Sequence, residues 1–164
     1  MSARVNVELQ VACRTATIPH ENDIRGWIED ALRASGGGAE GEYDVVVRVV
    51  DERESRALNY RFRQKDQPTN VLAFPAGDGD EAGSLPDAPE RPLGDLAVCA
   101  PVLEREAREQ GKSPAAHWGH LLVHGTLHLL GYDHQDAAAA ARMERLETSI
   151  LAAHGIADPY RDTT

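Results

Sequence analysis

The sequence predicts an α+β domain in which a small sheet of about four strands is backed by about five helices. Strand-like runs are interleaved with helical stretches in the first part of the chain, whereas helical patterns dominate the last part. A length of 164 residues, 41% of them hydrophobic, suffices for one buried core. We therefore expect a single domain spanning residues 1–164.

The beginning of the chain shows two strand patterns around one helix. Residues 5–11 alternate apolar and polar side chains, as in a strand with one buried face. Residues 43–50 are rich in β-branched side chains and predict a well-buried strand. The helix between them is expected to end at the glycines from Gly36. Its apolar side chains fall at helical spacing: Ile24, Trp27, Ile28, Ala31 and Leu32.

A second helix and a third strand are predicted next. Asp51 and Glu54 match a capping box, which predicts a helix running to about Arg63. The polar segment 66–70 favours a turn, and residues 71–75 predict a short strand after it.

The remaining segments predict one loop, one strand and three helices. Residues 77–92 almost lack large apolar side chains, which predicts a flexible loop. Residues 93–99 form a further strand pattern, and Pro101 can open the helix that follows. Ser113, followed by a proline, is a good helix cap, and an amphipathic helix is expected at about 136–153.

Charge, hydropathy and cysteine content limit the classes of function. The formal charge of −10 argues against broad, nonspecific adhesion to nucleic acid, although it allows a local basic groove. The N-terminus lacks the apolar core of a secretory signal, and no apolar run approaches membrane-spanning length. Cys13 and Cys99 form no metal or disulfide pattern and are expected to fill core space. These observations predict a cytoplasmic protein.

The helix that begins after Ser113 carries four histidines. At ~100° per residue they fall within about 80° of one another on the helix surface: His117, His120, His124 and His128. They cannot share one ion, because eleven residues of helix rise about 16 Å. Two histidines four residues apart can converge on one ion. His120 with His124, or His124 with His128, meets this condition. For His117 and for the unpaired His120, supporting or substrate-facing roles are favoured over ligation.

The residues after this helix favour the second pair. Gly131 can end the helix in a left-handed turn, which would bring His134 back toward His124 and His128. The resulting spacing matches the ligands of the metzincin signature HExxHxxGxxH. Three imidazoles leave one position open on a tetrahedral Zn²⁺, as in catalytic zinc sites. The predicted metal ligands are therefore His124, His128 and His134, at the end of a helix.

One departure from the protease signature points to another reaction. Position 125 holds glycine where HExxH enzymes carry the glutamate that acts as general base. Peptide hydrolysis needs that proton transfer, because its amine leaving group is poor. Phosphodiester cleavage mainly needs stabilised phosphoryl charge and an aligned nucleophile, which a metal ion and an arginine can supply. The site therefore indicates a hydrolase and argues against proteolysis.

Several long motifs resemble the YbeY family of bacterial endoribonucleases and ribosomal-RNA maturation factors. They are LNYRFRQKDQPTNVLAFP (58–75), LGDLAVC (93–99), AHWGHLLVHG (116–125), HGTLHLLGYDH (124–134) and DPY (158–160). The match covers roughly residues 40–160, in family order, with no departure at the metal ligands.

The resemblance implies a mixed sheet and a zinc-dependent, single-strand-specific endoribonuclease. Its expected role is 16S rRNA 3′-end maturation and ribosome quality control. Its expected partners are RNA and the small ribosomal subunit, including protein uS11 and the GTPase Era, with no membrane or DNA partner. Arg63 matches the family arginine that faces the metal, and it belongs to a basic cluster with Arg56, Arg61 and Lys65. Arginine suits phosphate because its planar fork donates two parallel hydrogen bonds.

Several alternatives stay open from the sequence. A metzincin-like protease with another base and a noncatalytic assembly factor with structural zinc are the competing functions. Another divalent transition metal can replace zinc in such a site. Asp133 either orients a ligand imidazole or is an exposed turn residue. The nucleophile is either water or the 2′-hydroxyl of the substrate.

Overall fold

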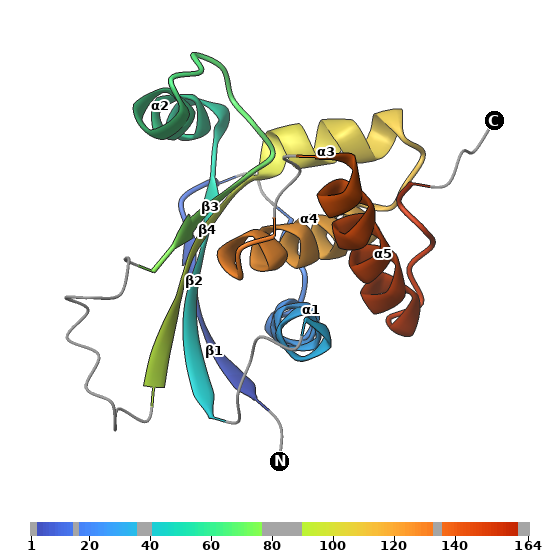
Figure 1. The fold of residues 1–164 in the computed structure, drawn as a ribbon. Helices are drawn as coiled ribbons and strands as arrows, with labels where there is room; N and C mark the ends of the chain where they lie inside the picture. Colours follow the sequence, from blue (N-terminus) through green and yellow to red (C-terminus); the bar gives the residue numbers. More distant parts are fainter. Residues whose placement is uncertain (1–2, 15–16, 36–40, 77–89, 133–135, 161–164) are drawn as a thin grey trace.

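The computed structural model describes residues 3–14, 17–35, 41–76, 90–132 and 136–160. Four strands and five helices lie in these ranges (Figure 1), which confirms the predicted α+β class. In chain order they are β1 (Arg4–Val11), α1 (Glu21–Ala34), β2 (Glu42–Val50), α2 (Glu52–Arg63), β3 (Val71–Pro75), β4 (Glu90–Cys99), α3 (Ala100–Glu109), α4 (Pro114–Leu129) and α5 (Ala137–Ala153).

The sheet is mixed, with strand order β1-β2-β4-β3. β1, β2 and β4 run parallel, whereas β3 pairs with β4 in the antiparallel sense. The short β3 is therefore an edge strand of the sheet. Its position matters for function because α4 lies directly against it.

The two faces of the sheet differ in polarity. The side chains of Val45, Val47 and Leu96 are buried, whereas Glu8 and Asp95, which pair in register with Val46, are exposed. Figure 1 shows α1, α4 and α5 grouped on one side of the strands. The sheet thus buries one face beneath helices, as the alternation of residues 5–11 predicts.

The first helix confirms its predicted inward face. Its buried residues are the five that helical spacing selects: Ile24, Trp27, Ile28, Ala31 and Leu32. α2 confirms half of its predicted capping box, because the Asp51 side chain accepts a hydrogen bond from the backbone N–H of Glu54. The carboxylate of Glu54 pairs with Arg48, with 2.6 Å between Oε2 and Nε.

The predicted loop over 77–92 needs a correction at its end. Residues 90–92 belong to β4, and residues 77–89 lie outside the described part of the chain. The strand starts early because β2 offers backbone partners to these residues, pairing Glu42 with Glu90 and Asp44 with Pro92. Strand pairing therefore overrides a local composition that favours a loop.

α4 is the central helix of the molecule. Ser113 caps it by accepting a hydrogen bond from the backbone N–H of Ala116, as predicted. It contacts β3, β4, α1, α3 and α5, which explains why most of its side chains are buried. Gly131 ends it with a φ of 99°, and Tyr132 N–H donates to the Leu127 carbonyl at 3.0 Å. This confirms the predicted left-handed turn.

Two further expectations concern hydropathy and cysteines. No helix within the described residues is long and apolar enough to cross a bilayer. Cys13 and Cys99 are both buried, as expected for cysteines that fill core space.

Candidate metal centre and substrate groove

His124 and His128 converge from consecutive turns of α4. Their Nε2 atoms lie 3.1 Å apart, and their ring centroids are separated by 4.6 Å. Two nitrogen ligands on a tetrahedral zinc ion lie about 3.3 Å apart, given a Zn–N bond of ~2.0 Å. The two imidazoles therefore fit a shared metal ion, and the spacing of four residues brings them together as predicted.

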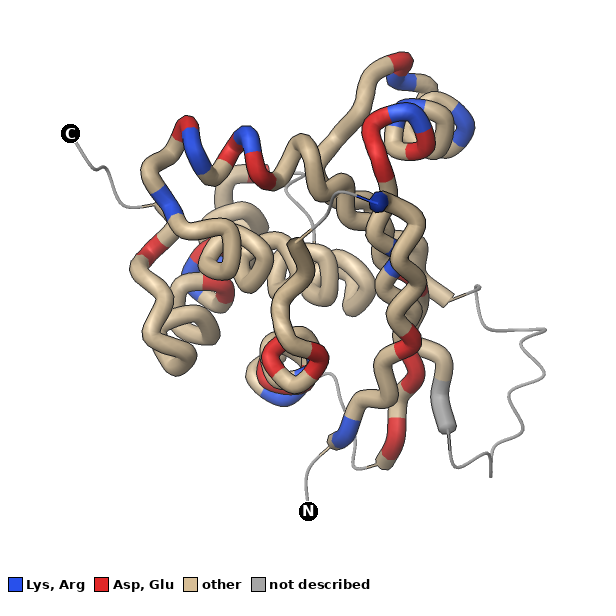
Figure 2. Tube along the Cα trace, turned by 180° about the vertical axis from the view of Figure 1, so that it is seen from behind, with Lys and Arg blue, Asp and Glu red and all other residues tan. Residues whose placement is uncertain are grey.

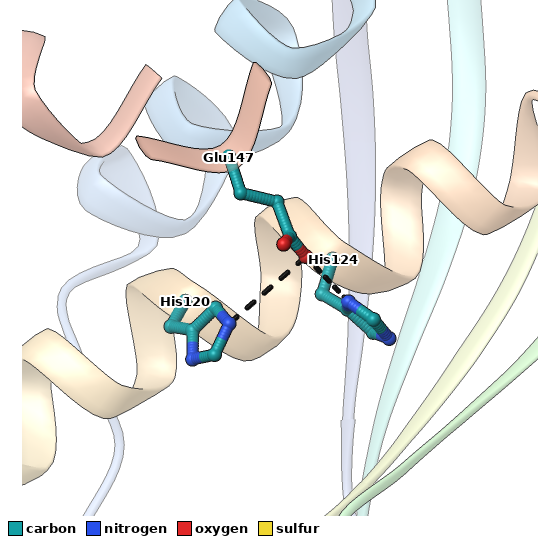
Figure 3. A group of neighbouring side chains, drawn as sticks. All are labelled: His120, His124 and Glu147. Atoms are coloured by element: carbon teal, nitrogen blue, oxygen red, sulfur yellow. Dashed lines mark hydrogen bonds and ion pairs between the residues drawn. The ribbon is translucent and has the colours of Figure 1, made fainter. Parts of the chain in front are cut away.

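Glu147 of α5 holds the other nitrogen of His124. Its carboxylate is fully buried and contacts His124 Nδ1, as Figure 3 shows. Burial would raise the pKa of Glu147, but its interactions with His124, Tyr160 and His120 together outweigh burial, and the pKa lies below its ordinary value. An ionised carboxylate accepts a hydrogen bond from Nδ1–H. Nε2 is then the unprotonated nitrogen of His124, the tautomer that binds a metal.

Tyr160 completes the hydrogen bonding of the same carboxylate. Its hydroxyl donates to the second oxygen of Glu147. The pKa of Tyr160 is raised, first by burial and then by its hydrogen bond to Glu147, so the phenol stays protonated. Each oxygen of the buried carboxylate therefore has its own donor, as buried charge requires.

His120 lies beside this network, one turn before His124. Its Nε2 is 3.3 Å from the Tyr160 hydroxyl and 4.0 Å from Glu147 Oε1. Burial lowers the pKa of His120 to about 4, so its imidazole is neutral near pH 7. Ligand atoms of His120, His124 and Glu147 all lie within 4.8 Å of one another. This group is a second possible cation site, and it shares His124 with the first.

His117 points elsewhere. It is buried against α3, where its Nε2 is 2.9 Å from Glu106 Oε1. Asn70, at the start of β3, donates to the same carboxylate at 3.0 Å. His117 thus ties α4 to α3 and to β3, in a supporting position, although its ring centroid lies 5.8 Å from that of His120.

The third predicted ligand, His134, lies outside the described residues, as does Asp133. The helix end before them borders the groove, because Gly131 and Tyr132 line the same cavity as His128.

A cavity of about 1080 Å³ opens beside the two histidines. Its lining joins three elements: Phe62 and Arg63 at the end of α2, residues 69–75 along β3, and His124 and His128 of α4. Arg63 is exposed to this cavity. The structure therefore places the predicted arginine and two of the predicted ligands along one groove.

The other members of the predicted basic cluster have different surroundings. Arg56 pairs with Asp66, with 2.7 Å between Nε and Oδ1. The guanidinium of Arg61 lies 5.3 Å from the centre of the Phe62 ring. Lys65 is exposed and follows the end of α2. Of these four basic residues, Arg63 alone lines the cavity.

The glycine at position 125 has a packing role. A Cβ atom at this position would lie 2.8 Å from Leu96 Cδ2, well inside van der Waals contact. Leu96 is fully buried in β4, so it has little room to move. The close approach of α4 to the sheet thus disfavours any larger side chain here, including the glutamate of the protease signature.

Sequence reasoning missed Glu147 and the contact of Tyr160 with it. A signal for Glu147 exists in the pattern of α5, since it occupies the buried stripe that also holds Met143, Ile150 and Leu151. A carboxylate on an apolar stripe must find a partner inside the protein. The identity of that partner depends on tertiary packing, because His124 is distant in the sequence.

The chain is similar to known proteins over nearly all of its length. Residues 10–155 match the family model described as Endoribonuclease YbeY. The Endoribonuclease YbeY of Alkalilimnicola ehrlichii is 55% identical over 157 residues, covering 96% of this chain and 90% of that protein. The protein of the same name from Halorhodospira halophila is 52% identical, covering 90% and 91%.

A solved structure supports the fold. The solution structure of a Thermotoga maritima protein matches with a TM-score of 0.53 and 21% sequence identity. The match covers 96% of this chain and 100% of the other. The family model and the two relatives confirm the resemblance found in the motifs. The chain belongs to the YbeY endoribonuclease family.

Proposed function

We propose that this protein is a metal-dependent, single-strand-specific endoribonuclease that acts in 16S rRNA 3′-end maturation and ribosome quality control. One observation carries the proposal: two converging imidazoles and an exposed arginine line the same open groove. The names and high identity of the relatives support RNA as the substrate.

The proposed metal ligands are His124, His128 and His134. The donor set suits Zn²⁺, and another divalent transition metal also accepts imidazole ligands. When bound, the ion supplies Lewis acidity toward a phosphoryl oxygen or a water molecule. His124 is kept in the required tautomer by Glu147.

Arg63 is the proposed phosphate-binding residue. Its guanidinium donates a planar fork of hydrogen bonds that matches two oxygens of a phosphodiester. In the proposed mechanism Arg63 orients the scissile phosphate and neutralises charge on its equatorial oxygens in the transition state. In HExxH enzymes a glutamate after the first histidine acts as the general base for peptide hydrolysis. Gly125 occupies that position here and cannot transfer a proton.

The preference for single strands is attributed to the aromatic wall of the groove. Phe62 lines the cavity beside Arg63 and is 52% exposed, although it packs 4.9 Å from the ring of Phe74. An exposed ring offers a stacking face for a base, and only unpaired bases can leave their helix to use it.

The acidic surface favours partner-directed activity. Figure 2 shows acidic and basic positions interspersed along α2 and α3, with acidic positions recurring along the strands. A net charge of −10 weakens unaided binding to a polyanion. We therefore propose that contacts on the small ribosomal subunit, such as uS11 and Era, direct the enzyme to its RNA in the cytoplasm.

The test is cleavage of a labelled single-stranded RNA by identically prepared wild type, His128→Ala and Arg63→Glu. Arg53→Glu makes the same charge change at the other end of α2, where Arg53 is exposed, and serves as the control. We expect wild type and Arg53→Glu to cleave, His128→Ala to lose metal and cleavage together, and Arg63→Glu to keep metal but lose cleavage.

Each alternative has its own signature. Equal cleavage by wild type and His128→Ala would assign the activity to a contaminant or another site. Cleavage of a duplex at the same rate would contradict single-strand specificity. A 2′,3′-cyclic phosphate product end identifies the 2′-hydroxyl as nucleophile, whereas a 3′-hydroxyl end with a 5′-phosphate on the other product identifies water.

A further inference from the structure

The segment after α5 is fastened to that helix by an aspartate. Asp158 Oδ1 accepts a hydrogen bond from the backbone N–H of Tyr160 at 2.8 Å, and from the Thr148 hydroxyl of α5 at 3.3 Å. The segment thereby turns back along α5, so that Tyr160 reaches Glu147, one residue before Thr148. This DPY motif has no role in the proposed reaction itself.

A continuous chain of contacts joins this segment to a proposed metal ligand. Tyr160 donates to one oxygen of Glu147, and the other oxygen contacts Nδ1 of His124. Glu147 is fully buried, so its orientation depends on these two partners rather than on water. The Tyr160 ring also packs edge-on against His120, with centroids 5.5 Å apart and an interplanar angle of 87°.

We infer that the segment 158–160 is a positioning device for the metal centre: Tyr160 holds Glu147, and Glu147 sets the ring orientation and tautomer of His124. The inference rests on the proposed function, because it takes His124 as a metal ligand. A carboxylate that accepts from a ligand imidazole fixes the ring and makes its other nitrogen a better donor to the metal.

The geometry favours this role over direct ligation by Glu147. Both oxygens of the carboxylate already have partners in Tyr160 and His124. For Glu147 to join His120 and His124 as a ligand, Nδ1 of His124 would have to give up the carboxylate and bind the ion instead. His124 Nε2, which faces His128 at 3.1 Å, would then point away from the metal.

The experiment measures metal binding rather than catalysis. The Zn²⁺ affinity of the full chain is determined by competition with a chromophoric chelator, and the absorption spectrum of the Co²⁺-loaded protein reports the ligand set. The variants are Tyr160→Phe, Glu147→Gln and Asp158→Asn. Tyr60→Phe is the matched control, because it removes the hydroxyl of an exposed tyrosine that lines no part of the groove.

We expect Tyr160→Phe and Glu147→Gln to weaken Zn²⁺ binding by about 10- to 100-fold, the usual cost of losing a partner of a ligand histidine. Asp158→Asn should weaken it less, and Tyr60→Phe should leave it unchanged. The Co²⁺ spectra should keep their tetrahedral intensity in all four variants. Circular dichroism of the metal-free proteins checks that each is folded, so that a merely structural defect is recognised.

Three outcomes would overturn the inference, and each is distinguishable. Unchanged affinity in a folded Tyr160→Phe variant would show that the segment does not position the site. Loss of binding in His120→Ala and Glu147→Gln, with binding kept in His128→Ala, would make Glu147 a ligand. A wild type that binds neither Zn²⁺ nor Co²⁺ would remove the metal centre, and with it the proposed function.

Discussion

At position 125 the lack of a side chain determines both packing and chemistry. Gly125 lets α4 approach β4 so closely that a Cβ atom at this position would lie 2.8 Å from Leu96 Cδ2. The same approach brings His124 and His128 of α4 beside β3, where they line the groove. The position that lacks the glutamate of the protease signature is thus the position at which α4, with the two proposed metal ligands, packs closely on the sheet.

Gly125→Ala is expected to destabilise the protein despite the higher helix propensity of alanine. Overpacking a core costs ~1–3 kcal/mol, whereas alanine gains about 1 kcal/mol over glycine in a helix. We expect a net loss of about 1 kcal/mol in the free energy of unfolding, measured by urea unfolding.

Gly26→Ala in α1 is the control, because its nearest contact would be an ordinary 3.6 Å, and it should be neutral or stabilising. If the clash with Leu96 is the cause, Leu96→Val should remove the penalty of Gly125→Ala; a penalty that persists there would contradict it.

Residues of the site differ in how far the sequence determines them. His124 and His128 could be paired from the sequence because one helical turn separates them, and helix geometry alone brings them together. Glu147 could not be paired with His124, because their contact depends on how α5 crosses α4. A local rule predicts contacts within an element, whereas contacts between elements require the packing.

At the scale of elements, one carboxylate ties three of them together. Glu106 of α3 is 2.9 Å from His117 Nε2 on α4, and it accepts a hydrogen bond from Asn70 at the start of β3. Burial would raise the pKa of Glu106, but the hydrogen bonds from His117 and Asn70 outweigh it, so the pKa is lowered. The ionised carboxylate therefore stabilises the position of β3, which borders the groove.

This tie predicts a pH dependence of stability. The folded-state pKa of Glu106 lies below its ordinary value of 4.5, so the unfolded chain takes up the proton first as the pH falls. The stabilisation is fully present above pH 4.5 and is lost as the pH falls through the folded-state pKa. Glu106→Gln should therefore lose less stability than wild type between about pH 5 and pH 3, measured by urea unfolding of the metal-free proteins.

The matched control for that measurement is Glu109→Gln. Glu109 lies on the same helix and is exposed, so its replacement should leave the acid-dependent loss of stability as it is in wild type. If the curves of Glu106→Gln and wild type coincide over this range, the ionised carboxylate of Glu106 contributes nothing to the attachment of β3.

The elements themselves were largely predictable, and their exceptions have a physical cause. Caps and periodicity predicted α1, α2 and α4, because those signals are local and strong: Asp51 and Ser113 both accept the expected backbone hydrogen bond. The start of β4 was predicted three residues too late, since its first residues are held by pairing with β2 rather than by their own composition. The strand order β1-β2-β4-β3 also could not be predicted from local sequence patterns, because it depends on pairing between distant segments.

At the scale of the whole molecule, the charge on the uncovered face of the sheet affects how RNA approaches the groove. The groove lies where β3 meets α2 and α4. The face that α1, α4 and α5 leave uncovered exposes Glu8 and Asp95, which flank Val46 in register across β1, β2 and β4; Asp95 also pairs with Phe74 at the edge of the groove. The pKa of Asp95 is raised by partial burial and by the nearby charge of Glu8. This acidic face contributes to the repulsion that an approaching RNA meets before it reaches the groove.

Neutralising these two charges should speed the association of RNA, and Asp95 is the nearer of the two to the groove because it pairs in register with Phe74. Glu8→Gln combined with Asp95→Asn removes two negative charges from a net charge of −10. At ~0.01 M ionic strength the Debye length is about 30 Å, so the charges of both residues act on an RNA that approaches the groove. We expect association of a short single-stranded RNA, followed by stopped-flow fluorescence, to accelerate about two- to fivefold at that ionic strength. In ~1 M salt the Debye length falls to about 3 Å, and the difference from wild type should vanish.

Asn6→Gln on the same face changes no charge and should leave the rate unchanged. A rate increase that persists in high salt would mean that the substitutions act through structure rather than through the field of the molecule.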